Sequence, residues 1–400
     1  SFKLEKTIID AEIQVLRELG VEIRCGVEVG RDVTIPQLRE QGFLAFYIAI
    51  GCQGGRLPGV PGEHAAGTDI AVHFLHEALA DENQHMDGRV VVIGGGNVAV
   101  DCARTAVRFG AEAVSMVCLE SRDTMSASKD EIAEAEEEHI EIHTGWGPKE
   151  LLQDESGHVT AVVFKKCLRT IDPETGKFAP VYDEAETITL PADHVVFAIG
   201  QAIEWGGLLK DTKVTFHRGN YPVADPLTYQ TAEADIFVGG DVYHGPKFVI
   251  DAIEEGKCAA ESLHRYVHKG ASLTIGRNRR DFVMLDKENF SVNCYDHAAR
   301  QTEAVDPAVE AHSFRDARKT LTSEQVQTET ARCLGCGASW VDPNKCIGCG
   351  VCTTKCVFDA IHLKRDHPEC STMMKAEDKL KGIASMACKR LGQTLRGRKG

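Results

Sequence analysis

The opening stretch of the chain alternates hydrophobic and polar positions in two different periods. Between residues 4 and 19, apolar side chains recur three and four positions apart and stop at Gly20, which predicts a helix packed by one face. The segment VEIRCGV that follows predicts a short strand. From Phe43 the continuous apolar run FLAFYIAIG predicts a buried strand, and it ends in the glycine- and proline-rich turn GCQGGRLPGVPGE. Such a turn is typical of a crossing between domains, so we place a domain boundary near residue 60.

The middle of the chain repeats the change from strand to glycine around a longer unit. The segment RVVVIGGGNVAVDCARTAVRFGAEAVSMVCLE predicts a strand, a tight turn, a helix and a second strand, which together form a βαβ unit. Further strands are predicted at 158–168 and 194–199, and the latter ends in AIGQ much as the earlier strand ends in AIGC. IFVGGD and IDAIEEGKCAAESLHRYV then predict a strand, a polar turn and a helix. The two strand ends AIGC and AIGQ bracket one inserted domain.

Beyond residue 270 the hydrophobic pattern fades and the charge pattern becomes informative. Residues 271 to 330 are polar and weakly periodic, as expected of a long connection laid over a surface. No acidic residue follows Asp378, so the basic tail is either a solvated end or a docking segment. The whole chain carries 60 acidic and 45 basic side chains, and this formal charge of -15 argues against a general nucleic-acid or anionic-membrane binder. A protein or small-molecule partner is expected instead.

The apolar runs and the N-terminus bear on location. The longest strongly apolar run, Phe43 to Ile50, is far shorter than the roughly 20 residues of a membrane-spanning helix, so no span is predicted. The N-terminal segment lacks the basic-then-apolar pattern of a secretory signal, and we expect a cytoplasmic protein. It also begins without methionine on an amphipathic helix, from which we expect further sequence upstream.

Fifteen cysteines are unevenly placed, and six of them lie between Cys333 and Cys356. This clustering indicates a metal site in a reducing compartment. The spacing C-x2-C-x2-C-x3-C is that of ferredoxins, in which three thiolates face one 4Fe-4S cluster and the fourth binds another cluster. We therefore expect a second cluster as well. The predicted ligands are Cys333, Cys336, Cys346, Cys349, Cys352, Cys356 and Cys370, with Cys388 completing eight thiols. Structural zinc is the alternative, but it prefers separated cysteine pairs. The remaining cysteines are expected to be small buried apolar side chains.

A glycine pattern in the βαβ unit predicts a dinucleotide site. Gly94, Gly96 and Ala99 form G-x-G-x-x-A, which allows a tight turn, close approach to a pyrophosphate and a helix N-terminus facing the phosphates. Glu120 ends the second strand, where an acid accepts hydrogen bonds from ribose hydroxyls and repels a 2′-phosphate. This favours NAD, although Arg122 leaves NADP open, and a purely structural glycine turn is the alternative. The predicted residues are Gly94, Gly95, Gly96, Asn97, Val98, Ala99, Glu120, Arg122 and Gly200.

Taken together, these motifs resemble the small (beta) subunit of glutamate synthase and its relatives, two-dinucleotide-domain flavoproteins that include the N-terminal part of dihydropyrimidine dehydrogenase. The likeness covers roughly residues 1 to 360 and is strongest in VVVIGGGNVAVDCARTA, HTGWGPKEL, HVVFAIGQ and DIFVGGDVYHGPKFVIDAIEEGKCAAESL. It implies an α/β fold of two dinucleotide-binding, Rossmann-like domains, with the NAD domain inserted in the FAD domain, plus a small α+β ferredoxin-like iron-sulfur domain.

The resemblance also implies an FAD site. In such proteins the aspartate of the GGD segment meets the FAD ribityl chain, and the next helix begins near the flavin ring. The implied residues are Ile50, Gly51, Gly240, Asp241, Gly245, Lys247, Phe248 and Val249. Relatives that use NADPH typically carry two arginines where this chain has Leu119 and Glu120, which supports NAD. The family's FAD fingerprint, another glycine-rich turn, has no equivalent in these 400 residues, so either upstream sequence or another chain is expected to complete the site.

These expectations define six segments and one function. The segments are part of an FAD-binding domain (1–60), an NAD-binding domain (61–200), the rest of the FAD-binding domain (201–270), a linker (271–330), a 4Fe-4S ferredoxin-like domain (331–365) and a basic tail (366–400). We expect an NADH-dependent oxidoreductase subunit that moves electrons between NAD(H), FAD and 4Fe-4S clusters to other subunits or ferredoxin, with electron bifurcation left open. The alternatives are a glutamate synthase or pyrimidine reductase small-subunit role and a non-catalytic electron-transfer scaffold. No catalytic residue is predicted, because the cofactors carry the chemistry.

Overall fold

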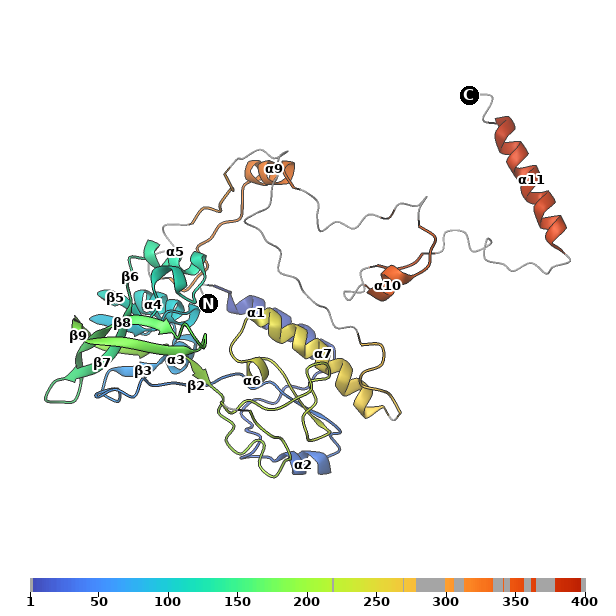
Figure 1. Ribbon diagram of the computed structural model, residues 1–400. Helices are drawn as coiled ribbons and strands as arrows, with labels where there is room; N and C mark the ends of the chain where they lie inside the picture. Colours follow the sequence, from blue (N-terminus) through green and yellow to red (C-terminus); the bar gives the residue numbers. More distant parts are fainter. Residues whose placement is uncertain are drawn as a thin grey trace. The chain divides into compact units, whose positions relative to one another are not determined.

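The computed structural model describes residues 3–217, 219–268, 270–277, 299–305, 313–333, 341, 346–355, 361–364 and 378–396. The chain divides into two compact units, Ser1–Val326 and Gln327–Gly400 (Figure 1). Within the first unit we distinguish the inserted half, residues 61–200, from the split half, residues 1–60 together with 201–270. Each half has a parallel sheet of its own.

The inserted half is built on a five-stranded parallel sheet with the strand order β3-β10-β4-β5-β6. Its strands are β3 (Thr68–Ile70), β4 (Arg89–Ile93), β5 (Ala113–Cys118), β6 (Glu141–Thr144) and β10 (His194–Phe197). Strands β4 and β10 are nearly continuous apolar runs, because the central strands of such a sheet are covered on both faces. The predicted strand-turn-helix-strand unit is confirmed in β4, α4 (Asn97–Arg108) and β5.

Each face of this sheet has its own cover (Figure 1). Helices α3 (Ala71–Ala80), α4 and α5 (Lys129–Glu137) pack on the face that carries Val90, Val92 and Met116. A three-stranded antiparallel sheet covers the face that carries Val91 and Ile93, and its strands are β7 (Trp146–Gln153), β8 (Val159–Ile171) and β9 (Phe178–Pro191). The strands predicted at 158–168 and 194–199 are confirmed as β8 and β10. The pattern does not predict β9, because none of its residues is buried and neither face of the strand therefore carries a core pattern.

The split half contains a much smaller parallel sheet. Strand β1 (Phe46–Ile48) pairs only with β12 (Ile236–Val238) among the described residues. Ile48, Ile236 and Val238 form its core with side chains from α2 (Ile35–Glu40) and the short α6 (Asp241–His244). Helix α7 (Val249–Val267) follows, as the sequence predicted. The two crossings between the halves lie side by side, because β2 (Gly54–Gly55) pairs with β11 (Gln201–Ala202).

Two predictions for the start of the chain are wrong. Helix α1 (Lys6–Glu18) forms, but it has no buried residue, so it is not packed by one face. Residues 21–27 do not form a strand, and Val21, Ile23 and Val27 are 50%, 42% and 48% exposed. Both segments have the amphipathic pattern of packed elements, but no described part of the chain covers their apolar side chains. An amphipathic pattern predicts that a segment has an apolar face, but it does not show whether another segment is present to cover that face.

The second unit contributes helices among its described residues. Helix α9 (Ser323–Ala331) crosses the border between the units, and α10 (Val351–Lys355) and α11 (Lys379–Arg396) follow. None of the described helices combines the length and the apolar character that crossing a membrane requires.

Candidate cofactor sites

The dinucleotide turn joins the carboxyl end of β4 to the start of α4. Gly94 has a φ of +151°, and a Cβ at this position would overlap the carbonyl oxygen of Ala198 just after β10. Gly96 is the N-cap of α4 and supplies no side chain to cap it. The N–H of Ala99 donates to the carbonyl of Gly96 at 2.9 Å, so the N–H groups that precede it at the helix start are the ones that can meet a bound anion, and the helix dipole favours negative charge there. This cradle of backbone donors fits a pyrophosphate.

The structure brings the predicted acid to this turn. A Cβ added to Gly95 would lie 3.0 Å from Oε2 of Glu120, so the carboxylate at the end of β5 stands directly beside the turn. Arg122, in the short 3-10 helix Arg122–Thr124, pairs with Glu136 at 2.7 Å. Gly200 lies farther along, in the turn between β10 and β11, where a Cβ would meet the side chain of Arg56. Arg56 and Gly200 therefore lie at the crossing between the two halves and not in the dinucleotide turn after β4.

Support for the turn comes from residues that the sequence analysis did not name. The backbone N–H of Ala127 donates to the carbonyl of Gly95 at 3.0 Å, and the N–H of Ser128 donates to Oδ1 of Asn97 at 2.9 Å. Ser128 is also the N-cap of α5, where its hydroxyl accepts from the N–H of Glu131. The spacing of Ser128 and Glu131 is the S-x-x-E signal of a helix start, and it could have predicted α5. The side chain of Asn97 therefore holds α5 against the turn.

A second site lies where β1 and β12 end. Gly240 has φ +70° and ψ -153°, a conformation that is essentially restricted to glycine. Its N–H donates to Oε2 of Glu255 at 2.5 Å, and Asp241 accepts from the N–H of Lys247 at 3.2 Å. Burial raises the pKa of Glu255, and the hydrogen bond from Gly240 opposes this effect. Sequence reasoning missed Glu255, which is 5% exposed and fixes the turn from behind.

The start of α7 exposes the apolar residues that the resemblance assigned to the flavin. Phe248 and Val249 are 68% and 76% exposed, and Ile250 beside them is 70% exposed. Gly245 has a φ of +82° and precedes them, close to the ring of Tyr221. An apolar surface next to the Asp241 carboxylate fits a flavin, whose ring is apolar and whose ribityl chain carries hydroxyls. Ile50 and Gly51 follow β1 at the same edge of the small sheet.

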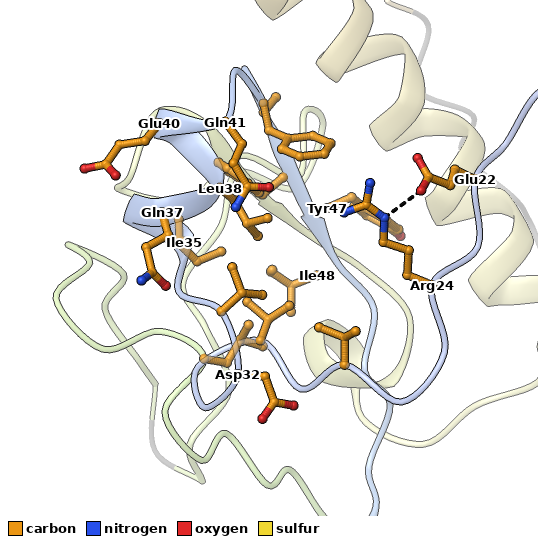
Figure 2. A pocket seen from close by; sticks show the side chains of 17 residues that line it. Glu22, Arg24, Asp32, Ile35, Gln37, Leu38, Glu40, Gln41, Tyr47 and Ile48 are labelled. Carbon is orange, nitrogen blue, oxygen red and sulfur yellow. Dashed lines mark hydrogen bonds and ion pairs between the residues drawn. The ribbon is translucent and has the colours of Figure 1, made fainter.

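Two hollows run along β1. The smaller, of about 520 Å³, is lined by Ile50 and Gly51 among others and has the size of a small-molecule pocket. The larger, of about 1130 Å³, is shown in Figure 2, where Ile35, Leu38 and Ile48 line it. At its edge the guanidinium of Arg24 donates to Glu22 at 2.6 Å (Figure 2). The split half thus has an open hollow that the predicted flavin residues Ile50 and Gly51 help to line.

The structure describes part of the predicted cluster site. Cys333, Cys346, Cys349 and Cys352 are exposed and unbridged, whereas Cys336, Cys356 and Cys370 lie outside the described residues. Gly348 and Gly350 have φ values of +67° and +79°, so the chain can wind tightly between the cysteines before α10 begins at Val351. The donor set is thiolate, which suits iron-sulfur clusters.

Close convergence of potential metal ligands occurs elsewhere in the described part of the chain. Only Asp69, His73 and Glu77 bring ligand atoms within 4.8 Å of one another there, and the described cysteines do not. A four-iron cluster separates its thiolates more widely than a single ion does. Among the other cysteines, Cys52, Cys102, Cys118 and Cys167 are buried as predicted. Cys25 is exposed, because the strand predicted around it does not form.

Comparisons with known proteins bear on both sites. Residues 36–256 match the family described as pyridine nucleotide-disulphide oxidoreductase, and residues 339–362 match the 4Fe-4S binding domain. The NADP(+)-dependent formate dehydrogenase subunit beta of Moorella thermoacetica is 32% identical over 84% of this chain and 48% of that protein. The glutamate synthase [NADPH] small chain of Halomonas elongata is 33% identical over 66% of this chain and 58% of that protein.

A third relative widens the range of substrates. The NAD-dependent dihydropyrimidine dehydrogenase subunit PreT of Escherichia coli O157:H7 is 31% identical over 68% of this chain and 59% of that protein. The chain spans about half the length of the curated relatives it matches. These matches confirm the predicted resemblance to glutamate synthase small subunits and the predicted fold class of Rossmann-like domains with a ferredoxin-like module. The chain belongs to the pyridine nucleotide-disulphide oxidoreductase family and carries a 4Fe-4S binding domain after it.

Proposed function

We propose that this chain is an NADH-dependent flavin and iron-sulfur oxidoreductase subunit that moves electrons between NAD(H), FAD and 4Fe-4S clusters and delivers them to partner subunits. The observation that carries this proposal is the position of Glu120 beside Gly95, at the carboxyl end of a parallel sheet and next to an uncapped helix start. Ligands bind at this edge in open α/β sheets. The relatives are named as formate dehydrogenase, glutamate synthase and dihydropyrimidine dehydrogenase subunits.

The preference for NADH rests on charge. The Glu120 carboxylate can accept hydrogen bonds from the adenosine ribose hydroxyls, and it would repel the 2′-phosphate of NADPH. Arg122 is the nearest cation in the sequence, but Glu136 pairs with it at 2.7 Å. Relatives with NADP, NADPH and NAD in their names occur side by side, so the family does not decide the nucleotide. The proposal therefore depends on Glu120.

The residues of this chain hold and orient the groups that react. The N–H groups at the start of α4 bind the pyrophosphate, and Asp241 orients the ribityl hydroxyls. The exposed apolar side chains of Phe248 and Val249 exclude water from the flavin edge. Bound FAD supplies the exchange between a two-electron hydride donor and one-electron acceptors. No side chain is assigned as a general acid or base.

The exit for electrons is the cysteine-rich segment of the second unit. We place one 4Fe-4S cluster on Cys346, Cys349 and Cys352 and a second on the cysteines around Cys333.

We also propose that further polypeptide completes the flavin site, because α1 and residues 21–27 expose amphipathic faces that need a neighbour. The relatives' names favour one second candidate, a glutamate synthase or pyrimidine reductase small-subunit role in which another chain binds the substrate. Electron bifurcation would be a property of the whole complex.

The test compares the two nucleotides on the purified complex, with iron and sulfide analysis of the same sample. NADH should bleach the flavin at lower concentration than NADPH, and Glu120→Gln should reduce that preference by about tenfold, because the repelling charge is lost. Glu137→Gln is the matched control, since Glu137 is exposed on α5 and its substitution removes one carboxylate without altering the ion pair of Arg122 with Glu136. Equal or better reduction by NADPH in the unaltered protein would reject the NADH assignment, and a preparation without iron and sulfide would reject the exit route.

A further inference from the structure

A phenylalanine from the predicted linker is inserted into the core of the inserted half. Phe314 is 9% exposed, and its ring centre lies 5.4 Å from that of Phe109 at the end of α4. The Nε of Arg108 donates to the carbonyl of Ser313 at 3.0 Å. We call residues 313–318 the strap. It is one large apolar side chain in a polar stretch, which is why the sequence pattern gave no sign of it.

The strap is also bonded to the start of the chain. Nε of Arg315 donates to Oε1 of Glu5 at 2.9 Å, and the N–H of Asp316 donates to the same oxygen at 3.3 Å. Arg318 donates to the carbonyl of Lys3 at 3.3 Å. Two segments that are far apart in the sequence therefore lie side by side on the inserted half.

Both segments rest on a buried ionic cluster between α4 and α5. Arg108 donates to Oε2 of Glu138 at 2.7 Å and Arg104 donates to Oε1 of Glu138 at 2.9 Å, and the three side chains are 5% to 10% exposed. Burial raises the pKa of Glu138, but the two guanidinium groups outweigh it, so the net pKa is lowered. Lys3 pairs with Glu131 at 2.6 Å and with Asp101. Because Arg108 bonds both Glu138 and the strap, the strap sits on a rigid, charged base.

The strap changes the length of chain that leads to the clusters. The preceding anchor among the described residues is Arg277, which donates to the carbonyls of Leu227 at 3.0 Å and Cys258 at 2.9 Å. The extended length of a chain bounds how far its end can lie from its last anchor. With the strap seated, the anchor for Cys333 is Arg318, and with the strap released it is Arg277. Seating the strap therefore shortens that bound by roughly fourfold.

We propose that the strap anchors the chain that leads to the cluster-bearing unit on the inserted half, and that this shorter tether keeps the thiolates within reach of the flavin. Phe314 is its anchor, and Glu5 and Arg108 are positioning residues that act through it. This inference rests on the proposed function for its kinetic consequence. The docking itself rests only on the contacts of Phe314 and Arg315.

The experiment compares Phe314→Ala with Phe314→Leu and with Phe178→Ala, in the full chain within its complex. Phe178 is 63% exposed, so the third variant makes the same chemical change without touching the strap. Trypsin should cut after Arg315 and Arg318 at least about tenfold faster in Phe314→Ala, because seated residues are protected from cleavage. Stopped-flow mixing with NADH should leave flavin bleaching within about twofold and slow cluster bleaching by about tenfold, because effective concentration falls steeply with tether length. Phe314→Leu should behave nearly as the unaltered protein.

Three outcomes would overturn the inference. Unchanged trypsin cleavage would mean that Phe314 does not seat the strap. Faster trypsin cleavage with an unchanged rate of cluster bleaching would mean that the strap does not control how far the clusters can move from the flavin. A parallel fall of flavin and cluster rates would point to damage of the inserted half alone. If neither nucleotide bleaches the flavin of the unaltered protein, the proposed function fails, and the docking is still judged by trypsin cleavage and by the maximum dimension of Phe314→Ala in X-ray scattering, which should grow.

Discussion

The inserted half and the split half of the first unit contain similar kinds of elements but bury them to different degrees. In the inserted half, Val90, Val91 and Val92 of β4 are at most 1% exposed, and both faces of the sheet are covered. In the split half the parallel sheet has two strands, α1 has no buried residue, and Phe248 at the start of α7 is 68% exposed. The inserted half therefore closes its own core, whereas the split half leaves apolar surface for other molecules.

The exposed apolar side chains of the split half include runs of near neighbours in three segments of the chain. Single exposed apolar residues are normal, but contiguous apolar patches mark surfaces that bind something. Helix α1, residues 21–27 and the start of α7 each carry several such side chains. Under the proposed function, flavin covers the start of α7 and additional polypeptide covers the other two segments. The comparison thus predicts where stability depends on partners and where it does not.

The largest expected effect separates the halves with one kind of substitution. Phe197→Ala in β10 should lower the free energy of unfolding by about 3–5 kcal/mol, because it removes a ring that is 1% exposed. Phe248→Ala should change it by less than about 0.5 kcal/mol in the flavin-free chain, because the ring is on the surface. Urea unfolding followed by circular dichroism measures both. Equal losses would show that the split half buries Phe248 after all, and the comparison would fail.

The same contrast explains how far the sequence alone could lead. The β4–α4–β5 unit was predictable because buried strands and an amphipathic helix carry their periods locally, and because Gly94 and Gly96 mark the turn between them. The strand predicted at residues 21–27 does not form, because a strand needs a neighbour and the pattern cannot say whether one is present. Strand β9 was missed for the opposite reason, since pairing with β8 holds it although its own side chains show little alternation.

The candidate sites divide in a similar way. Glu120 and Gly95 meet as the spacing predicted, because the ends of adjacent parallel strands lie at one edge of a sheet. Glu255 and Phe314 were not predictable, since each acts through a contact with a distant segment and no local motif marks it. The cysteine ligands stay a prediction, because Cys336, Cys356 and Cys370 lie outside the described residues.

A smaller effect is expected at the turn that holds Asp241 in the split half. Glu255→Leu should cost about 1–3 kcal/mol, because the N–H of Gly240 would lose its buried acceptor. Glu255→Gln keeps an acceptor oxygen and should cost less than about 1 kcal/mol. Since burial raises the pKa of Glu255 above 4.5, its contribution to stability is full below pH 4.5 and is lost as the pH rises through the raised value.

The pH dependence gives the readout for this pair of variants. Unfolding free energies measured in steps upward from pH 4.5 should fall more steeply in the unaltered chain than in Glu255→Gln, which cannot ionise. A slope that Glu255→Gln leaves unchanged would show that this carboxyl is not the group that titrates. The control is amide hydrogen exchange in the strands of the inserted half, which should respond to neither variant.

The smallest effects are expected where the two halves are alike. Each has an arginine that clasps a carboxylate just before a strand, Arg89 with Asp193 at 2.9 Å and Arg39 with Asp235 at 2.7 Å. Asp193→Asn and Asp235→Asn should each cost no more than about 1 kcal/mol, because such pairs stay close to solvent. The side-chain hydrogen bond from Arg89 lowers the pKa of Asp193 from 3.8 to about 2, so its contribution is present above pH 3.8 and is lost as the pH falls through about 2. Acid unfolding monitored by circular dichroism should be less steep in this range for Asp193→Asn. A loss of unfolding free energy several times larger for Asp235→Asn than for Asp193→Asn would mean that charge as well as packing distinguishes the halves. The split half would then depend for its stability on an ion pair, whereas the inserted half depends on its buried strands.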